Sequence, residues 1–341
     1  MDRSNPEPLS CDGVEVRFGS LCAVAGADLS VRAGEIVALL GRSGSGKTTL
    51  LRAIAGFERV TAGEIRIGGS LIESPSHSVP AHRRSVGLVF QEYALFPNKT
   101  VAGNLAYGLG RTGHDRVEEL LRTGQLEGLA RRYPHQLSGG QQQRVALLRS
   151  LAPRPRVLLL DEPFSNLDAG LRLAMREEVA SILRAESMTA VLVTHDRADA
   201  MAIADRIAVM EAGHVIEFAT PTGLYFNPAN PAAAGYGGEV QFIEATARGG
   251  TAETPFGDVP LASPFDGPCR VLIRPEWLIP APGVSVSVRA RRFEGAHTRL
   301  TIEAPGGATA AMTIASTAPQ ASADHFCVAV RQPLPAYPAA E

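Results

Sequence analysis

The feature that most constrains this sequence is a glycine-rich loop, GRSGSGKT, at residues 41–48. An apolar run at 35–40, typical of a buried strand, precedes it, and a helical pattern at 49–55 follows it. Glycine lets the backbone curl so that successive N–H groups point inward, and the start of a helix adds a partial positive charge. We therefore expect this loop to hold the phosphate groups of a nucleotide.

Each residue of the loop is assigned to this site. Lys47 is expected to reach the β- and γ-phosphates as a point charge, and the Thr48 hydroxyl to bind Mg²⁺. Arginine is no substitute at this position, and lysine occurs otherwise only as Lys99, so its presence here strengthens the assignment. ATP and Mg²⁺ are the expected ligands. The expected nucleotide-binding residues are Gly41, Arg42, Ser43, Gly44, Ser45, Gly46, Lys47, Thr48 and Thr49.

A second apolar run, at 157–160, ends in the carboxylates Asp161 and Glu162. Neighbouring side chains of a strand point to opposite sides, so these two are expected to have different roles. We expect Asp161 to bind Mg²⁺ and Glu162 to orient and deprotonate the attacking water. A strand that merely ends in polar surface is the alternative.

Composition narrows the class of protein. The formal net charge of −2 gives no electrostatic reason to expect binding to nucleic acid or to an anionic membrane. The four cysteines have no metal-binding spacing. The apolar runs are of strand length and the first ten residues contain no apolar stretch, so neither a membrane helix nor a secretion signal is expected.

The pattern along the chain predicts two domains. An α/β domain is expected at 9–237, with a largely parallel sheet whose strands include 14–18, 35–40, 85–90, 157–160, 190–193 and 207–210. Residues 171–183 repeat apolar side chains at helical spacing. Beyond 237 the alternating runs at 284–293, 298–304 and 326–332 predict a small all-β domain at 238–341.

The stretch LSGGQ at 137–141, directly before a helical run, resembles the signature motif of ABC ATPases. The resemblance implies a phosphate-loop core, a helical signature subdomain at about 92–152 and a C-terminal domain of the TOBE or OB-like type. It also implies that residues 138–141 form a second anion cradle, which binds the nucleotide of another copy. These residues are Ser138, Gly139, Gly140 and Gln141.

Other positions match the family in order along the chain. Phe18 resembles the aromatic residue on which adenine stacks; a plain core aromatic is the alternative. Gln91 resembles the glutamine that contacts Mg²⁺ and senses the membrane partner. Asp168, in SNLD, resembles the loop that crosses the dimer interface, and His195 resembles the histidine at the γ-phosphate.

The stretch PHQLSGGQQQRVALLRSLAPRP is most similar to subunits of ferric-iron importers, and the wider set includes polyamine, sulfate, molybdate and sugar importers. The resemblance implies a peripheral protein at the cytoplasmic face of the inner membrane. Its expected partners are a second copy in a head-to-tail nucleotide-sandwich dimer, membrane-spanning permease subunits and, indirectly, an external solute-binding protein. A soluble ABC ATPase outside transport is the less favoured alternative.

Two questions stay open at this level. Leu95, Phe96 and Tyr107 could either contact the permease or pack inside the helical subdomain. The C-terminal domain could bind nucleic acid, as small barrels often do, but it has no excess of basic residues, and a regulatory or dimer-packing role is favoured.

Overall fold

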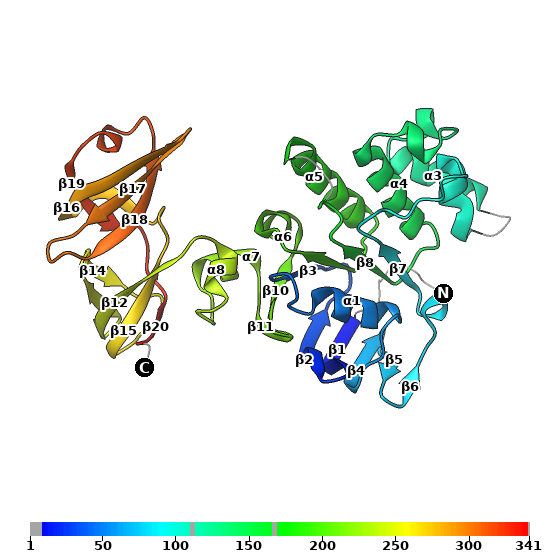
Figure 1. Cartoon of the computed structure of the whole chain (residues 1–341), viewed down its shortest axis with the longest axis horizontal. Helices are drawn as coiled ribbons and strands as arrows, with labels where there is room; N and C mark the ends of the chain where they lie inside the picture. Colours follow the sequence, from blue (N-terminus) through cyan, green and yellow to red (C-terminus); the bar gives the residue numbers. More distant parts are fainter. Residues whose placement is uncertain (1–8, 110–112, 166–168, 340–341) are drawn as a thin grey trace. The chain divides into compact units, whose positions relative to one another are not determined.

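The structure is a computed structural model that describes residues 9–109, 113–165 and 169–339. The chain divides into two compact units, the first ending at Pro221 and the second beginning at Thr222 (Figure 1). The change in composition near residue 237 lies beyond this division, so α7 (Pro221–Phe226) and α8 (Ala234–Gly237) belong by their contacts almost wholly to the second unit.

A central sheet of six strands organises the first unit. Five neighbouring strands are parallel, as expected from their continuous apolar runs, and β11 joins one edge antiparallel. All six strands predicted from the sequence are present, five of them in this sheet. In sheet order the strands are β11 (His214–Ala219), β10 (Arg206–Glu211), β3 (Ile36–Leu40), β9 (Ala190–Thr194), β8 (Val157–Asp161) and β7 (Val86–Val89).

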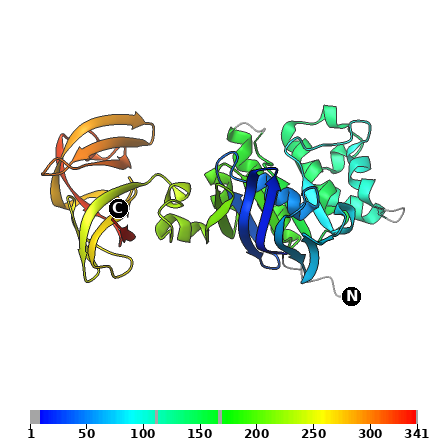
Figure 2. The ribbon, with the colours of Figure 1, turned by 60° about the horizontal axis from the view of Figure 1, so that its bottom comes forward.

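The second sheet of this unit was predicted only in part. It is antiparallel, and the strands at 9–18 and 21–31 show plainly in blue in Figure 2. Register shifts interrupt the pairing of these two strands, so the alternation of buried and exposed residues is irregular and gives a weak sequence signal. In sheet order the strands are β2 (Leu21–Val31), β1 (Leu9–Phe18), β4 (Ala62–Ile67), β5 (Ser70–Ser74) and β6 (His77–Ser78).

The helices of the first unit connect these strands. The predicted helices at 49–55, 141–151 and 171–183 correspond to α1, α4 and α5, each slightly longer than its pattern. The α-helices are α1 (Lys47–Ala55), α2 (Val101–Leu105), α3 (His114–Thr123), α4 (Gly139–Leu151), α5 (Ala169–Ala185) and α6 (Arg197–Ile203). Short 3₁₀ turns are η1 (Ala81–Arg83), η2 (Ala106–Gly108), η3 (Glu127–Leu129) and η4 (Pro134–Gln136).

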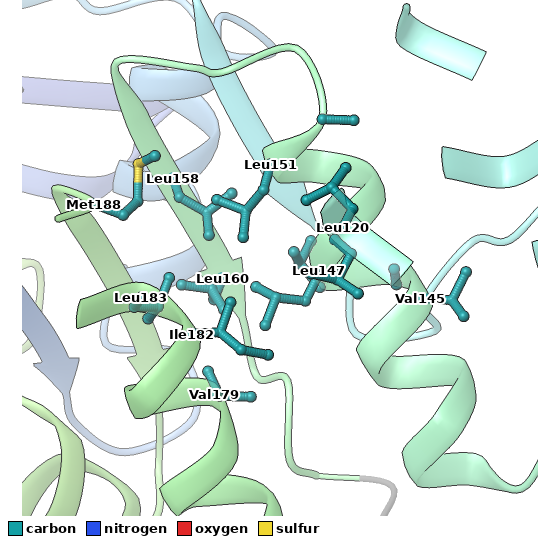
Figure 3. Packing of buried hydrophobic residues seen from close by; sticks show 14 of the residues in the cluster. Leu120, Val145, Leu147, Leu151, Leu158, Leu160, Val179, Ile182, Leu183 and Met188 are labelled. Atoms are coloured by element: carbon teal, nitrogen blue, oxygen red, sulfur yellow. The ribbon is translucent and has the colours of Figure 1, made fainter. Parts of the chain in front are cut away.

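Alternate residues of the central strands enter two different cores. Leu158 and Leu160 of β8 pack with side chains of α3, α4 and α5 (Figure 3), whereas Val157 and Leu159 pack with α1 and the antiparallel sheet. Both faces of the sheet are therefore covered, and in its five parallel strands the polar side chains lie at the strand ends.

The second unit is all-β apart from short helices, as predicted, with a single core shared by two antiparallel sheets. The alternating runs at 284–293, 298–304 and 326–332 lie in or overlap β16, β17 and β19. One sheet contains β14 (Gly257–Pro260), β13 (Thr251–Thr254), β12 (Gln241–Arg248), β15 (Gly267–Ile273) and β20 (Ala336–Pro338). The other contains β18 (Thr309–Ala315), β17 (His297–Glu303), β16 (Leu278–Glu294) and β19 (His325–Val330), and η5 (Pro319–Ala321) precedes β19.

Candidate functional site

The loop between β3 and α1 requires glycine for steric reasons. Gly44 and Gly46 have φ of +80° and +99°, in the left-handed region that side chains disfavour. A Cβ on Gly46 would lie 2.3 Å from the Ala23 carbonyl oxygen, and one on Gly41 would lie 2.3 Å from that of Met210. The surrounding backbone thus holds the loop in a curled form that only glycine permits.

Lys47 closes this loop from inside. It is the first residue of α1, its side chain is 4% exposed, and its ammonium donates to the carbonyl oxygens of Gly41 at 2.8 Å and Arg42 at 2.7 Å. Burial lowers the pKa of Lys47, and the Glu162 and Asp161 carboxylates oppose that shift. The ammonium is a positive charge at the helix N-terminus, facing the position where the loop would hold phosphate oxygens.

Thr48 and Asp161 come together although they are far apart in sequence. The Thr48 hydroxyl donates to Asp161 Oδ1 at 3.2 Å. Asp161 ends β8, and β3, which precedes the loop, is separated from β8 only by β9. Burial raises the pKa of Asp161, while the hydrogen bond from Thr48 lowers it. A hydroxyl oxygen beside a carboxylate is a donor set that suits Mg²⁺.

Glu162 and His195 form a second pair at the same edge of the sheet. His195 Nδ1 lies 3.0 Å from Glu162 Oε2, and the backbone N–H of Glu162 donates to the Val193 carbonyl oxygen at 3.0 Å. Glu162 has φ of +45°, a left-handed conformation that is costly for a glutamate. The Glu162 carboxylate contacts the His195 ring nitrogen, whereas the Asp161 carboxylate accepts from Thr48, so the two carboxylates have different partners.

A polar network that sequence analysis missed fixes the backbone on either side of His195. The Thr194 hydroxyl donates to Asp199 Oδ2 at 3.0 Å and accepts from the N–H of Asp196 at 3.0 Å. Arg176 of α5 forms ion pairs with Asp196 and Asp199. Asp196 is also the N-cap of α6. An aspartate directly before a helix is the sequence signal that could have revealed this part.

The remaining predicted residues lie elsewhere on the first unit. Gln91 is exposed, two residues beyond the end of β7, and Phe18 is 48% exposed at the end of β1, which disfavours the alternative of a plain core aromatic. Asp168 lies outside the described residues.

The predicted second cradle is the capped N-terminus of α4. The Ser138 hydroxyl accepts from the N–H of Gln141 at 3.4 Å, and the Gln141 side chain accepts from the N–H of Ser138 at 3.0 Å. Ser138 and Gly139 are exposed, and Gly140 is buried. This reciprocal cap leaves other N–H groups of the first turn directed outward, where an anion could bind.

Together the curled loop with Lys47, the pair of Thr48 and Asp161, and the pair of Glu162 and His195 define the class of phosphate-loop ATPases. The family model described as "ABC transporter" matches residues 24–165. With the relatives below, this match shows that the chain belongs to the ABC transporter family and is one of its ATPases.

Three relatives illustrate the similarity. The chain is 43% identical over 275 residues to the "Fe(3+) ions import ATP-binding protein FbpC" of Mesorhizobium japonicum, covering 79% of this chain and 76% of that protein. It is 46% identical to the protein of the same description in Pseudomonas fluorescens, covering 80% and 78%. It is 45% identical to the "Sulfate/thiosulfate import ATP-binding protein CysA 2" of Chromobacterium violaceum, covering 88% and 85%.

Solved structures agree on the fold. A dimeric bacterial ABC transporter cassette aligns with a TM-score of 0.54 at 29% identity, covering 62% of this chain and 98% of that chain. The same cassette in a post-hydrolysis state bound to ADP and Pi aligns with a TM-score of 0.53 at 30% identity. Among the residues that the structure describes, no helix is long and apolar enough to span a membrane.

Proposed function

We propose that this chain is the ATP-hydrolysing subunit of a ferric-iron importer. The observation that carries the proposal is that Lys47, the pair of Thr48 and Asp161 and the pair of Glu162 and His195 occur in a chain 43–46% identical to relatives described as Fe(3+) import proteins.

The loop residues from Gly41 to Thr49 are proposed to hold the phosphates of ATP. The carbonyl oxygens that Lys47 now contacts belong to the loop itself, so the ammonium can turn to phosphate oxygens without leaving the site. Phe18 is proposed as the platform for adenine because its ring is half exposed at a strand end.

Thr48, Asp161 and Gln91 are proposed to hold Mg²⁺. The hydroxyl and carboxylate oxygens 3.2 Å apart fit such an ion, and the amide of Gln91 would add an oxygen from the edge of the sheet. Bound Mg²⁺ would neutralise charge that develops on the phosphates.

Glu162 is proposed as the base that orients and deprotonates the attacking water. Its carboxylate is partly exposed and held by His195, so one oxygen can accept a proton while the other keeps its partner. His195, whose Nδ1 contacts this carboxylate, is proposed to donate a hydrogen bond to the γ-phosphate.

A second copy is proposed to complete each site with its Ser138–Gln141 cradle, with Asp168 at the interface. Support comes from the dimeric cassettes that align with this chain and from the exposed helix N-terminus at Ser138. Permease subunits at the cytoplasmic face of the inner membrane are the further proposed partners, and an external solute-binding protein would act through them. Tyr107 is 61% exposed and Phe96, which contacts it, is partly exposed, and both support a contact there. Leu95 instead packs against the core beneath the helical subdomain.

Sulfate is the second candidate for the transported solute. The sulfate/thiosulfate relative is 45% identical and covers 88% of this chain, a larger share than either iron relative named above. Uptake of labelled ferric iron and of labelled sulfate by cells lacking the gene separates the two. Loss of iron uptake alone supports the proposal, and loss of sulfate uptake alone contradicts the choice of solute.

Substitution of Glu162 tests the mechanism. We expect Glu162→Gln to bind ATP with unchanged affinity, to lose about a thousandfold in turnover, and to accumulate as an ATP-bound dimer, because the site can close but cannot activate water. ATPase assays and size-exclusion chromatography with ATP measure this. Glu177→Gln, an exposed glutamate on α5, is the control and should behave like the wild type. Turnover near the wild-type rate in Glu162→Gln would remove Glu162 from its role.

A further inference from the structure

The last turn of α4 is hydrogen-bonded to the segment that follows β7. The two terminal nitrogens of Arg149 donate to neighbouring carbonyl oxygens, that of Ala94 at 2.7 Å and that of Tyr93 at 3.1 Å. The next residue, Ser150, donates from its hydroxyl to the Leu88 carbonyl oxygen of β7 at 2.9 Å. The helix that begins at Ser138 is thus tied, at its other end, to the strand and turn on either side of Gln91.

The turn at Tyr93 and Ala94, which accepts these hydrogen bonds, has an unusual backbone conformation. Tyr93 and Ala94 have φ of +59° and +46°, two consecutive left-handed residues of which neither is glycine. Such a conformation persists only where surrounding contacts hold it, and it directs both carbonyl oxygens toward the Arg149 fork. The planar guanidinium offers a separate terminal nitrogen to each carbonyl oxygen, whereas a shorter-reaching lysine would have to serve both from one nitrogen.

The same guanidinium also reaches the aromatic pair of Phe96, which is partly exposed, and Tyr107. It lies 5.3 Å from the centre of the Phe96 ring, and that ring lies 4.1 Å from the Tyr107 ring, whose side chain is 61% exposed. Buried Asn104 accepts from the N–H of Phe96 at 2.9 Å and fixes the backbone there. A continuous series of contacts therefore joins α4, the turn beyond Gln91 and an exposed aromatic surface.

We propose that Arg149 is a positioning residue that holds Gln91 in its place at the ATP site and keeps the turn in register with α4. The inference rests on the role proposed above for Gln91. Burial lowers the pKa of Arg149, and its partners within the described part of the chain are two carbonyl oxygens and the face of the Phe96 ring. A purely local role, a positive charge near the carboxyl end of a helix, is the competing explanation.

Two substitutions separate these explanations. Arg149→Lys keeps a charge at the helix end but loses the fork, and Arg149→Met removes both charge and donors at similar size. Arg184→Lys is the matched control, because Arg184 lies in the last turn of α5 and also donates to a carbonyl oxygen, that of Ile203. Each variant is compared with the wild type by hydrogen exchange of the full chain and by steady-state ATPase kinetics.

We expect amide exchange at Tyr93 and Phe96 to rise about tenfold in Arg149→Lys and further in Arg149→Met, because the turn loses a charged hydrogen bond. The turnover number should fall about tenfold with the KM for ATP unchanged within about twofold, since a shifted Gln91 affects hydrolysis more than binding. Arg184→Lys should show neither change.

Wild-type exchange and turnover in Arg149→Lys would overturn the proposal and leave a helix-end charge as the explanation. Equal losses in Arg149→Lys and Arg184→Lys would overturn it as well. A wild-type chain that hydrolyses no ATP would instead contradict the proposed function, and the exchange measurement would still decide whether Arg149 holds the turn.

Discussion

At the scale of single residues, the phosphate loop separates two reasons for glycine. Gly44 and Gly46 both have positive φ, but only at Gly46 would a Cβ meet another atom, the Ala23 carbonyl oxygen at 2.3 Å. Backbone strain acts at both positions, and steric overlap acts at one.

Substitution by alanine distinguishes these effects. We expect Gly44→Ala to lower the free energy of unfolding by about 1 kcal/mol, the cost of a left-handed alanine. Gly46→Ala should lower it by about 2–4 kcal/mol, because the overlap also displaces β2 or the start of α1. Urea denaturation of the nucleotide-free chain measures both. Equal losses in the two variants would mean that Ala23 gives way without cost.

Residue spacing along the sequence predicted the phosphate loop and the two carboxylates of the candidate site. It did not predict the side chains that hold these residues in place. The loop at 41–48 and the carboxylates after β8 were recognisable because each directly follows a strand and their chemistry is specific. Asp199 and Arg149 could not be recognised from the sequence, because their partners come from distant parts of the chain and because a lone aspartate or arginine on a helix is common. Pairing across elements is decided by the fold, which spacing along one element does not encode.

At the scale of elements, β8 is the strand on which the site and the core depend together. Asp161 ends it, and Leu160, one residue earlier and 1% exposed, packs in the core shared with α4 and α5 (Figure 3). A loss of packing at Leu160 therefore bears on stability and on the placement of Asp161.

Leu160→Ala should lower the free energy of unfolding by about 2–5 kcal/mol, because it opens a cavity in a closely packed core. Leu173→Ala, on an exposed face of α5 with the side chain 59% accessible, should change it by no more than about 0.5 kcal/mol. Chemical denaturation followed by circular dichroism compares them. A small loss in Leu160→Ala would show that the helices relax to fill the space.

In the second unit, a buried arginine joins a helix to the sheet. Arg274 is fully buried, donates to the Tyr225 carbonyl oxygen at 3.0 Å and lies 4.4 Å from the centre of the Tyr225 ring. The Tyr225 phenol donates to the Glu276 carboxylate. Burial, followed by this carboxylate, raises the pKa of Tyr225 to about 12.

This raised pKa predicts a pH dependence for the second unit. The folded state keeps the phenol protonated where the unfolded chain, with its ordinary value of 10.0, would ionise. The contribution of Tyr225 to stability is thus complete below about pH 10 and is lost as the pH rises through 12. The stability difference between wild type and Tyr225→Phe should shrink over this range. Urea midpoints read by Trp277 fluorescence measure it; a difference that does not change with pH would contradict the assignment.

Secondary-structure elements were predicted best where one hydrophobic periodicity continues without interruption through the element. The apolar runs of β3, β8 and β9 and the alternation in β16, β17 and β19 were predicted because burial imposes one period on each strand. The antiparallel sheet that contains β2 and β4 was predicted only in part, because bulges break the alternation of buried and exposed residues and its strands are rich in small residues.

At the scale of the whole molecule, the first unit contains two hydrophobic cores and the second contains one, and the candidate site lies entirely in the first unit. The single tryptophan of the chain, Trp277, is 3% exposed in the core of the second unit. The helices of seven or more residues, α1 and α3 to α6, all belong to the first unit. Helical circular dichroism therefore reports on one unit and tryptophan fluorescence on the other.

A nucleotide should then stabilise the two units unequally. Because a ligand stabilises only the structure that binds it, ADP at 100 times its dissociation constant should add about 2.7 kcal/mol to the unfolding free energy seen by circular dichroism. The unfolding transition seen by Trp277 fluorescence should stay at the same denaturant concentration. A Lys47→Ala variant, lacking the ammonium at the phosphate loop, should show no shift by either probe. Equal shifts by both probes in the wild type would mean that the two units unfold together in one cooperative transition, and the second unit would then sense nucleotide through its stability.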